Sequence, residues 1–176
     1  KILLVFPTHS FEDCDDLYDF NQFSQCIDEM AKDYDTVLIS MIGYDIQQGF
    51  DKQYRNKGYR IVSSGTRNDP YFLNRQRDLM ELADMTISNN IGTHIGYSIC
   101  LGTPHYIFNQ DITSIKKAAS AQASDHLQAI RDREYAEIKA VFNSREPIIT
   151  PEQIAVVKKY WGPFEIKPKF YANTQE

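Results

Sequence analysis

The stretch Ile87–Phe108, ISNNIGTHIGYSICLGTPHYIF, decides the predicted fold. The end of an apolar strand leads through a polar turn with one glycine into an apolar helix from about Thr93 to Leu101. Gly102 ends this helix, and a second apolar strand, PHYIF, follows. A strand, a helix and a strand in this order predict two parallel strands, because parallel neighbours need a long crossover connection.

The same alternation extends toward the start of the chain. Apolar segments typical of strands begin at Lys1, Thr36, Tyr59 and Met85 (KILLVF, TVLISMIGY, YRIVSS and MTIS). Helical patterns lie between them at about Tyr18–Lys32, Ile46–Asn56 and Tyr71–Leu82, and THSFEDCDD is expected to be a polar loop. We therefore predict an α/β fold: a Rossmann-like doubly wound parallel sheet of about five to six strands, with helices on both faces.

A helical C-terminal extension is expected after this core. Residues 114–142 read as largely helical, and a closing helix has Thr150 as its cap, Pro151 in its first turn, Gln153 at the third position and Gly162 at its end. The predicted division is a core of residues 1–110 and an extension of residues 111–176 that packs on the same domain. Because the chain opens without methionine on a strand pattern, we expect a fragment of a two-domain protein.

Composition excludes several classes of function. With 176 residues and 42% hydrophobic residues the chain can form one globular domain, and a net charge of -5 argues against a nucleic-acid partner. No apolar run predicts a membrane span, and three cysteines without C-x-x-C spacing favour the cytoplasm over an oxidising compartment. The dinucleotide, P-loop and nucleophile-elbow motifs are all absent from the sequence.

Polar residues collect after three of the expected strands. Because the carboxyl ends of parallel strands share one edge, we expect these residues to form a ligand site there. The candidate binding residues are Thr8, His9 and Ser10; Ser64, Gly65, Thr66 and Arg67; and Ser88, Asn89, Asn90, Gly92, Thr93 and His94.

A phosphate site is one interpretation of the turn before the helix at Thr93. Gly92 would let a ligand approach the backbone, and the start of the helix would offer unpaired N–H donors. Arg67 is the best candidate for a cationic partner. The alternative is an ordinary helix cap with no ligand. The two histidines lack metal-ligand spacing and the acidic run after residue 11 is typical of a solvated loop, so we assign no metal.

The stretch RQRDLMELADMTISNNIGTHIGYSICLGTPHYIF resembles the donor-binding, C-terminal half of bacterial GT-B-type glycosyltransferases of surface-polysaccharide synthesis. The residues that match are Ala83-Asp84, Ser88, Asn89, Gly92, Leu101-Gly102 and Pro104. The start KILLVFPTHS and the late ITPEQIAVVKKYWG are similar to such enzymes as well. Sugar-nucleotide epimerases and glycerophosphotransferases of teichoic-acid synthesis share the same pattern.

The resemblance implies a domain that binds a nucleotide-sugar as its substrate, without a cofactor. Residues 64–67 would face the base or ribose, and residues 88–94 would hold the phosphates. His94 and Arg67 would be catalytic, stabilising the departing nucleotide diphosphate. A missing N-terminal acceptor-binding domain would supply the general base, so the fragment should bind without turnover. The parent protein is expected in the cytoplasm, where it could lie at the inner face of the membrane.

Three alternatives to a glycosyltransferase half stay open from the sequence. The chain could be a sugar-nucleotide epimerase-like half or a glycerophosphotransferase-like half, each with a different preferred ligand. It could also be a Rossmann-like binding module without chemistry, in which the polar turns are only caps.

Overall fold

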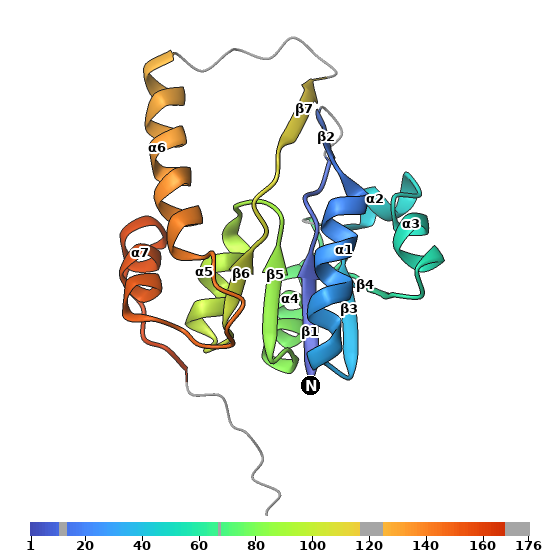
Figure 1. Ribbon diagram of the computed structural model, residues 1–176. Helices are drawn as coiled ribbons and strands as arrows, with labels where there is room; N and C mark the ends of the chain where they lie inside the picture. The colour runs from blue at the N-terminus through green and yellow to red at the C-terminus, as the bar shows by residue number, and fades with distance from the viewer. Residues whose placement is uncertain (11–13, 67, 117–124, 168–176) are drawn as a thin grey trace, which may run out of the picture.

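A five-stranded parallel sheet forms the centre of the protein. The computed structural model describes residues 1–10, 14–66, 68–116 and 125–167. The sheet has the order β4-β3-β1-β5-β6, and its strands are β1 (Ile2–Phe6), β3 (Thr36–Ser40), β4 (Arg60–Val62), β5 (Met85–Ser88) and β6 (His105–Ile107) (Figure 1). The chain runs outward from β1 to one side and then returns to build the other side. The predicted Rossmann-like doubly wound sheet is therefore confirmed.

Helices connect these strands and cover both faces of the sheet. They are α1 (Phe20–Met30), followed by a 3-10 turn at Ala31–Asp33, α2 (Gly43–Gln47), α3 (Asp51–Asn56), α4 (Phe72–Leu82), α5 (Thr93–Cys100), α6 (Asp125–Val141) and α7 (Pro151–Trp161). Side chains of β1 alternate between the two faces, as the pleat of a strand requires. Leu3 and Val5 pack in one core with Phe23 and Ile27 of α1. Leu4 and Phe6 pack in a second core, which contains residues of α4 and the end of α5.

The C-terminal helices join the edge of the sheet through a third core. Ile95 and Ile99 of α5 pack with Ile138 of α6 and with Val157 of α7. The predicted capping box of α7 is confirmed, because Thr150 and Gln153 each accept a hydrogen bond from the other's backbone N–H. This core attaches the C-terminal helices to the β6 side of the sheet.

The sequence analysis was wrong about two short segments that form strands. Cys14–Tyr18 is β2, although residues 14–16 were expected in a polar loop and Tyr18 at the start of a helix, and Ile112–Lys116, expected in part as helix, is β7. The two strands pair antiparallel in a separate two-stranded ribbon, which rises beyond the carboxyl ends of the parallel strands (Figure 1). Of the predicted helix over residues 114–142, residues 114–116 are strand, residues 125–141 form α6, and residues 117–124 lie outside the described residues.

The expected helix Ile46–Asn56 is two shorter helices. Gly49 lies between α2 and α3 with φ +80°, a left-handed conformation that interrupts a helix. Gly58 and Gly102 end their helices at positive φ, as predicted.

Candidate functional site

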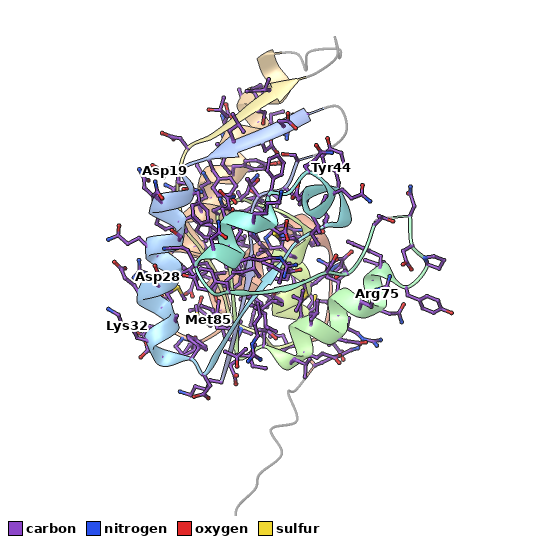
Figure 2. The ribbon with its side chains drawn as sticks, turned by 90° about the vertical axis from the view of Figure 1, so that its right-hand side faces the viewer. Asp19, Asp28, Lys32, Tyr44, Arg75 and Met85 are labelled. Atoms are coloured by element: carbon purple, nitrogen blue, oxygen red, sulfur yellow. The ribbon has the colours of Figure 1, made fainter. Side chains whose placement is uncertain are left out.

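A cleft of about 820 Å³ lies at the carboxyl ends of β1, β3, β4 and β5. These ends surround the point where the strand order reverses, on either side of β1. Open parallel sheets bind ligands at such a switch point. Figure 2 shows Tyr44 of α2 and Arg75 of α4 on the side of the molecule opposite Asp28 and Lys32 of α1.

The cleft brings together most of the residues that the sequence selected. Its walls include Thr8, His9, Ser64, Thr66, Asn90, Gly92, Thr93 and His94. Four other selected residues do not line it, namely Ser10, Gly65, Ser88 and Asn89. Arg67 lies outside the described residues, although Thr66 and Asn68 on either side of it both line the cleft.

The polar turn after β5 is tied to the loop after β1. The backbone N–H of Thr8 donates to Oδ1 of Asn89 at 2.6 Å, and Nδ2 of Asn90 donates to Oγ1 of Thr8 at 2.9 Å. Oδ1 of Asn90 accepts the N–H of Ile91 at 2.8 Å. Much of the polarity in this turn therefore fixes the two loops against each other.

Ser88 belongs to a buried network behind the cleft. Its hydroxyl donates to the carbonyl of Asn90 at 2.7 Å and lies 3.0 Å from Nε2 of His105. A hydroxyl has one proton, so Ser88 must accept the Nε2–H of His105. Nδ1 of His105 lies 2.7 Å from Oγ1 of Thr86, which also lies 3.1 Å from the carbonyl of Pro104. Burial and the nearby His94 hold the pKa of His105 well below its usual value, so this imidazole is neutral.

His94 lies at the first turn of α5, where its ring stacks on Phe6 with the centroids 4.9 Å apart. Burial, reinforced by His9, lowers its pKa to about 3, so His94 is neutral at physiological pH. A neutral imidazole can form hydrogen bonds with a phosphate, but its N–H is too weakly acidic to protonate it. The low pKa therefore favours hydrogen bonding over proton donation as the chemistry available to His94.

Position 92 favours glycine because the His94 ring leaves no room for a Cβ, and its backbone angles do not require glycine. Its φ of -161° is extended and open to any residue. A Cβ at this position would lie 2.8 Å from both Cε1 and Nδ1 of the His94 ring. The space on the Cβ side of Gly92 is thus filled by the His94 ring, while Gly92 itself lines the cleft, and its predicted role in admitting a ligand stays a prediction.

α5 begins without a side-chain cap. Gly92 is its N-cap residue and offers no side-chain acceptor, and Thr93 occupies the first helical position instead of capping the helix. Since both residues line the cleft, the start of α5 opens into it. Uncapped N–H groups and the positive end of the helix dipole attract anions.

Three buried polar atoms near the cleft have no hydrogen-bond partner within the described part of the chain. They are Oγ of Ser64, Nδ2 of Asn89 and Nε2 of His94. Ser64 and His94 line the cleft itself. Buried polar atoms are normally satisfied, so these atoms indicate a place for a polar ligand or for water.

Arg75 of α4 bonds to the loop after β4. Nε of Arg75 donates to the carbonyl of Ser64 at 3.1 Å, and its guanidinium pairs with Asp69. Gly65 has φ +89°, and its carbonyl accepts the N–H of Gly43 at 3.1 Å. Gly65 therefore supports the cleft wall without lining it.

Sequence reasoning missed the wall that follows β3. Ser40, Met41, Ile42, Gly43, Tyr44 and Gln47 line the cleft, together with Asn68, Phe72 and Gln76 of the α4 region. Most residues of the first group read as a continuation of an apolar strand. The topology was the available signal, because β3 ends at the same edge as β1.

The comparisons with known proteins do not identify this site. No family model, curated protein or solved structure matches the chain. No Lys or Arg occurs among the described residues that line the cleft, and Asp16 is their one carboxylate. The start of α5 is thus the main positive feature of the walls that the structure describes.

A smaller cavity of about 160 Å³ lies next to the cleft and shares Thr8, Asp16 and Met41 with it. Asp45 lines this cavity and accepts the N–H of Ser10 at 3.2 Å. Burial raises the pKa of Asp45 to about 6, with Asp15 and Asp16 adding to the shift.

Within the described residues, no group of three or more metal-ligating side chains occurs. Nor does any helix there combine the length and apolar character needed to cross a membrane.

Proposed function

We propose that the chain is the nucleotide-sugar-binding domain of a glycosyltransferase that uses a nucleotide-diphosphate donor in bacterial capsular or surface-polysaccharide synthesis. The observation that carries this proposal is the uncapped start of α5, which opens into a cleft at the switch point of a parallel sheet. A volume of about 820 Å³ falls in the usual range for small-molecule sites.

The start of α5 is the proposed binding site for the diphosphate. Backbone N–H groups there, with the hydroxyls of Thr8 and Thr93, would replace the hydration of the phosphate oxygens. His94 would act as a neutral hydrogen-bonding group toward the departing diphosphate. In this role it would stabilise the negative charge that develops on the diphosphate when the bond between sugar and phosphate breaks.

The base and ribose are proposed to lie toward β4. Ser64 and Thr66 supply polar groups at that end, and Ile42 and Phe72 supply apolar surface for a flat base. β4 and β5 are separated by two strands in the sheet, so these ends of the cleft are roughly 14 Å apart at the usual strand spacing. An extended nucleotide-sugar is long enough to reach both.

Calorimetric titration with UDP, GDP, CMP and their sugar conjugates tests the proposal. We expect one nucleotide to bind, and to bind about tenfold more weakly when Arg67→Ala removes the candidate cationic partner or Ser64→Ala removes a buried hydroxyl. Arg77→Ala is the matched control. Arg77 pairs with Asp78 and Glu81 on α4 and lies outside the cleft walls, so its loss should leave affinity unchanged.

The other outcomes are equally informative. Preference for a polyol-phosphate conjugate of a nucleotide would favour a glycerophosphotransferase-like half. Preference for UDP-N-acetylhexosamines together with epimer formation would favour an epimerase-like half. Absence of binding by every nucleotide and conjugate would contradict the proposal and favour a module without chemistry.

A further inference from the structure

The outer edge of β7 is an open strand edge. β7 pairs with β2 on one side, and no described strand pairs with its other side. Thr113, Ser114 and Ile115 are exposed, and Ile115 is 49% exposed despite its apolar side chain. In Figure 1, β2 lies on the α2 side of the ribbon and β7 on the far side.

The opposite edge of the ribbon, at β2, is covered by the domain. The backbone N–H of Asp16 donates to Oγ of Ser10 at 3.1 Å, so it points away from β7. Leu17 and Tyr18 also line the small cavity together with Asp45, Phe50 and Gln53 of the α2–α3 region. New strand pairing at β2 would have to displace these contacts.

The direction of the Asp16 N–H also fixes the direction of the Ser114 backbone. Asp16 lies opposite Ser114 in the antiparallel register. Because the Asp16 N–H faces outward, this is a non-hydrogen-bonded pair, and the N–H and C=O of Ser114 point outward on the other side. The middle residue of β7 therefore presents a donor and an acceptor at the exposed edge, and no described strand pairs with them.

Nothing in the sequence of β7 protects this edge. Proteins usually guard open edges with proline or charge, but ITSIK has its single charge at its last position and contains two β-branched isoleucines and a threonine. A two-stranded ribbon is also only marginally stable, and three or more strands with an apolar face are usual. Leu17 and Ile115 are the exposed apolar residues of this ribbon.

We propose that β7 pairs antiparallel with β7 of a second copy of this chain, about a twofold axis at Ser114. Full overlap of the five-residue strand requires this centre, where the two Ser114 backbones would exchange hydrogen bonds. The arrangement closes on itself, whereas pairing of β7 with β2 of another copy would be open-ended. Pairing of β2 with β2 about its middle residue would instead place Asp16 of one copy opposite Asp16 of the other.

Two matched double variants test this register by light scattering over a wide concentration range. Both carry Ile115→Lys, which faces Asp15 within the ribbon, and they differ only at Thr113. In the proposed dimer, Thr113 of one copy lies opposite Ile115 of the other. Thr113→Lys/Ile115→Lys should weaken dimerisation about tenfold or more, because two like-charged pairs oppose each other. Thr113→Glu/Ile115→Lys should dimerise at least as well as the native chain.

A disulfide measures the same contact independently. Opposed residues of a hydrogen-bonded pair have Cα atoms about 5.5 Å apart, within reach of a disulfide. Ser114→Cys should give a covalent dimer on mild oxidation, and Gln128→Cys on the exposed part of α6 should not. A native chain that stays monomeric at every concentration would overturn the proposal. Equal dimerisation of the two double variants would also overturn it. Dimerisation that only Ile130→Lys abolishes would overturn it as well and would place the interface on α6.

Discussion

Gly92 and His94 form one steric unit at the start of α5. Gly92→Ala is expected to destabilise the protein by about 1–3 kcal/mol, because its Cβ would lie 2.8 Å from the His94 ring. In a His94→Ala background the ring is gone, so the same substitution should cost little. Urea unfolding of the two single variants and the double variant measures this coupling. Equal costs of Gly92→Ala in both backgrounds would show that the ring is not the obstacle.

Two neutral histidines make the folded state sensitive to acid. The pKa values of His94 and His105 lie below 6.5 in the folded state, so below about pH 6.5 the unfolded chain binds more protons and folding stability falls. Asp45, with its pKa raised to about 6, has the opposite effect. We expect the free energy of unfolding to decrease by roughly 1–3 kcal/mol from pH 7 to pH 5.

Urea unfolding at the two pH values checks this expectation. Asp45→Asn removes the opposing contribution and keeps an acceptor for the Ser10 N–H, so it should steepen the loss. A stability that is level or rises toward pH 5 would mean that the histidines are not held neutral.

Individual site residues were predictable only in part. Thr8, Thr93 and His94 were found because polar residues at strand ends and helix starts collect at one edge of a parallel sheet. Ser88 follows the same pattern but turns inward to His105, and nothing local in the sequence indicates that direction. Met41 and Ile42 were missed because they read as strand residues.

At the scale of elements, α5 and α7 meet at Gly96. A Cβ there would lie 2.8 Å from Cγ of Trp161, so the glycine lets the two helices approach closely. Gly96→Ala should destabilise the protein by about 1–2 kcal/mol, even though alanine favours helix by about 1 kcal/mol.

Trp161 reports on this contact directly, because it is the single tryptophan of the chain. Its fluorescence emission should shift in Gly96→Ala. Tyr97→Ala, on the exposed side of the same helix, should leave the emission unchanged and alter stability by no more than about 0.5 kcal/mol. An unchanged emission and stability in Gly96→Ala would show that the helices can separate without cost.

Local signals explain which elements the sequence could predict. β1 is a continuous apolar run, and α7 has a capping box, an N-terminal proline and a final glycine. β2 lacks such a signal because it is mostly polar, and β7 lacks one because its residues were expected in part as helix. They pair across residues 14–18 and 112–116, without a turn between them to mark a hairpin. Their pairing is a property of the tertiary fold.

At the scale of the whole molecule, the parallel sheet assembles the cleft from loops that are distant in sequence. Residues 8–10, 63–66 and 89–94 follow β1, β4 and β5, which all end at one edge. The ribbon β2–β7 rises from the same edge (Figure 1), and Asp16 of β2 lines the cleft. Through Asp16, the proposed dimer contact at β7 lies one strand away from the proposed ligand site.

Hydrogen exchange can detect this assembly in a single experiment. On addition of the nucleotide conjugate that binds best in calorimetry, amides of residues 8–10, 63–66 and 89–94 should all exchange more slowly, because one ligand contacts all three loops. Residues 33–35 and 83–84, at the opposite edge of the sheet, are the internal control and should not change. Slower exchange in one loop alone would show that the ligand contacts only that loop, which would contradict a site built from all three. Uniform slowing across the chain, controls included, would indicate general stabilisation by a ligand that binds elsewhere.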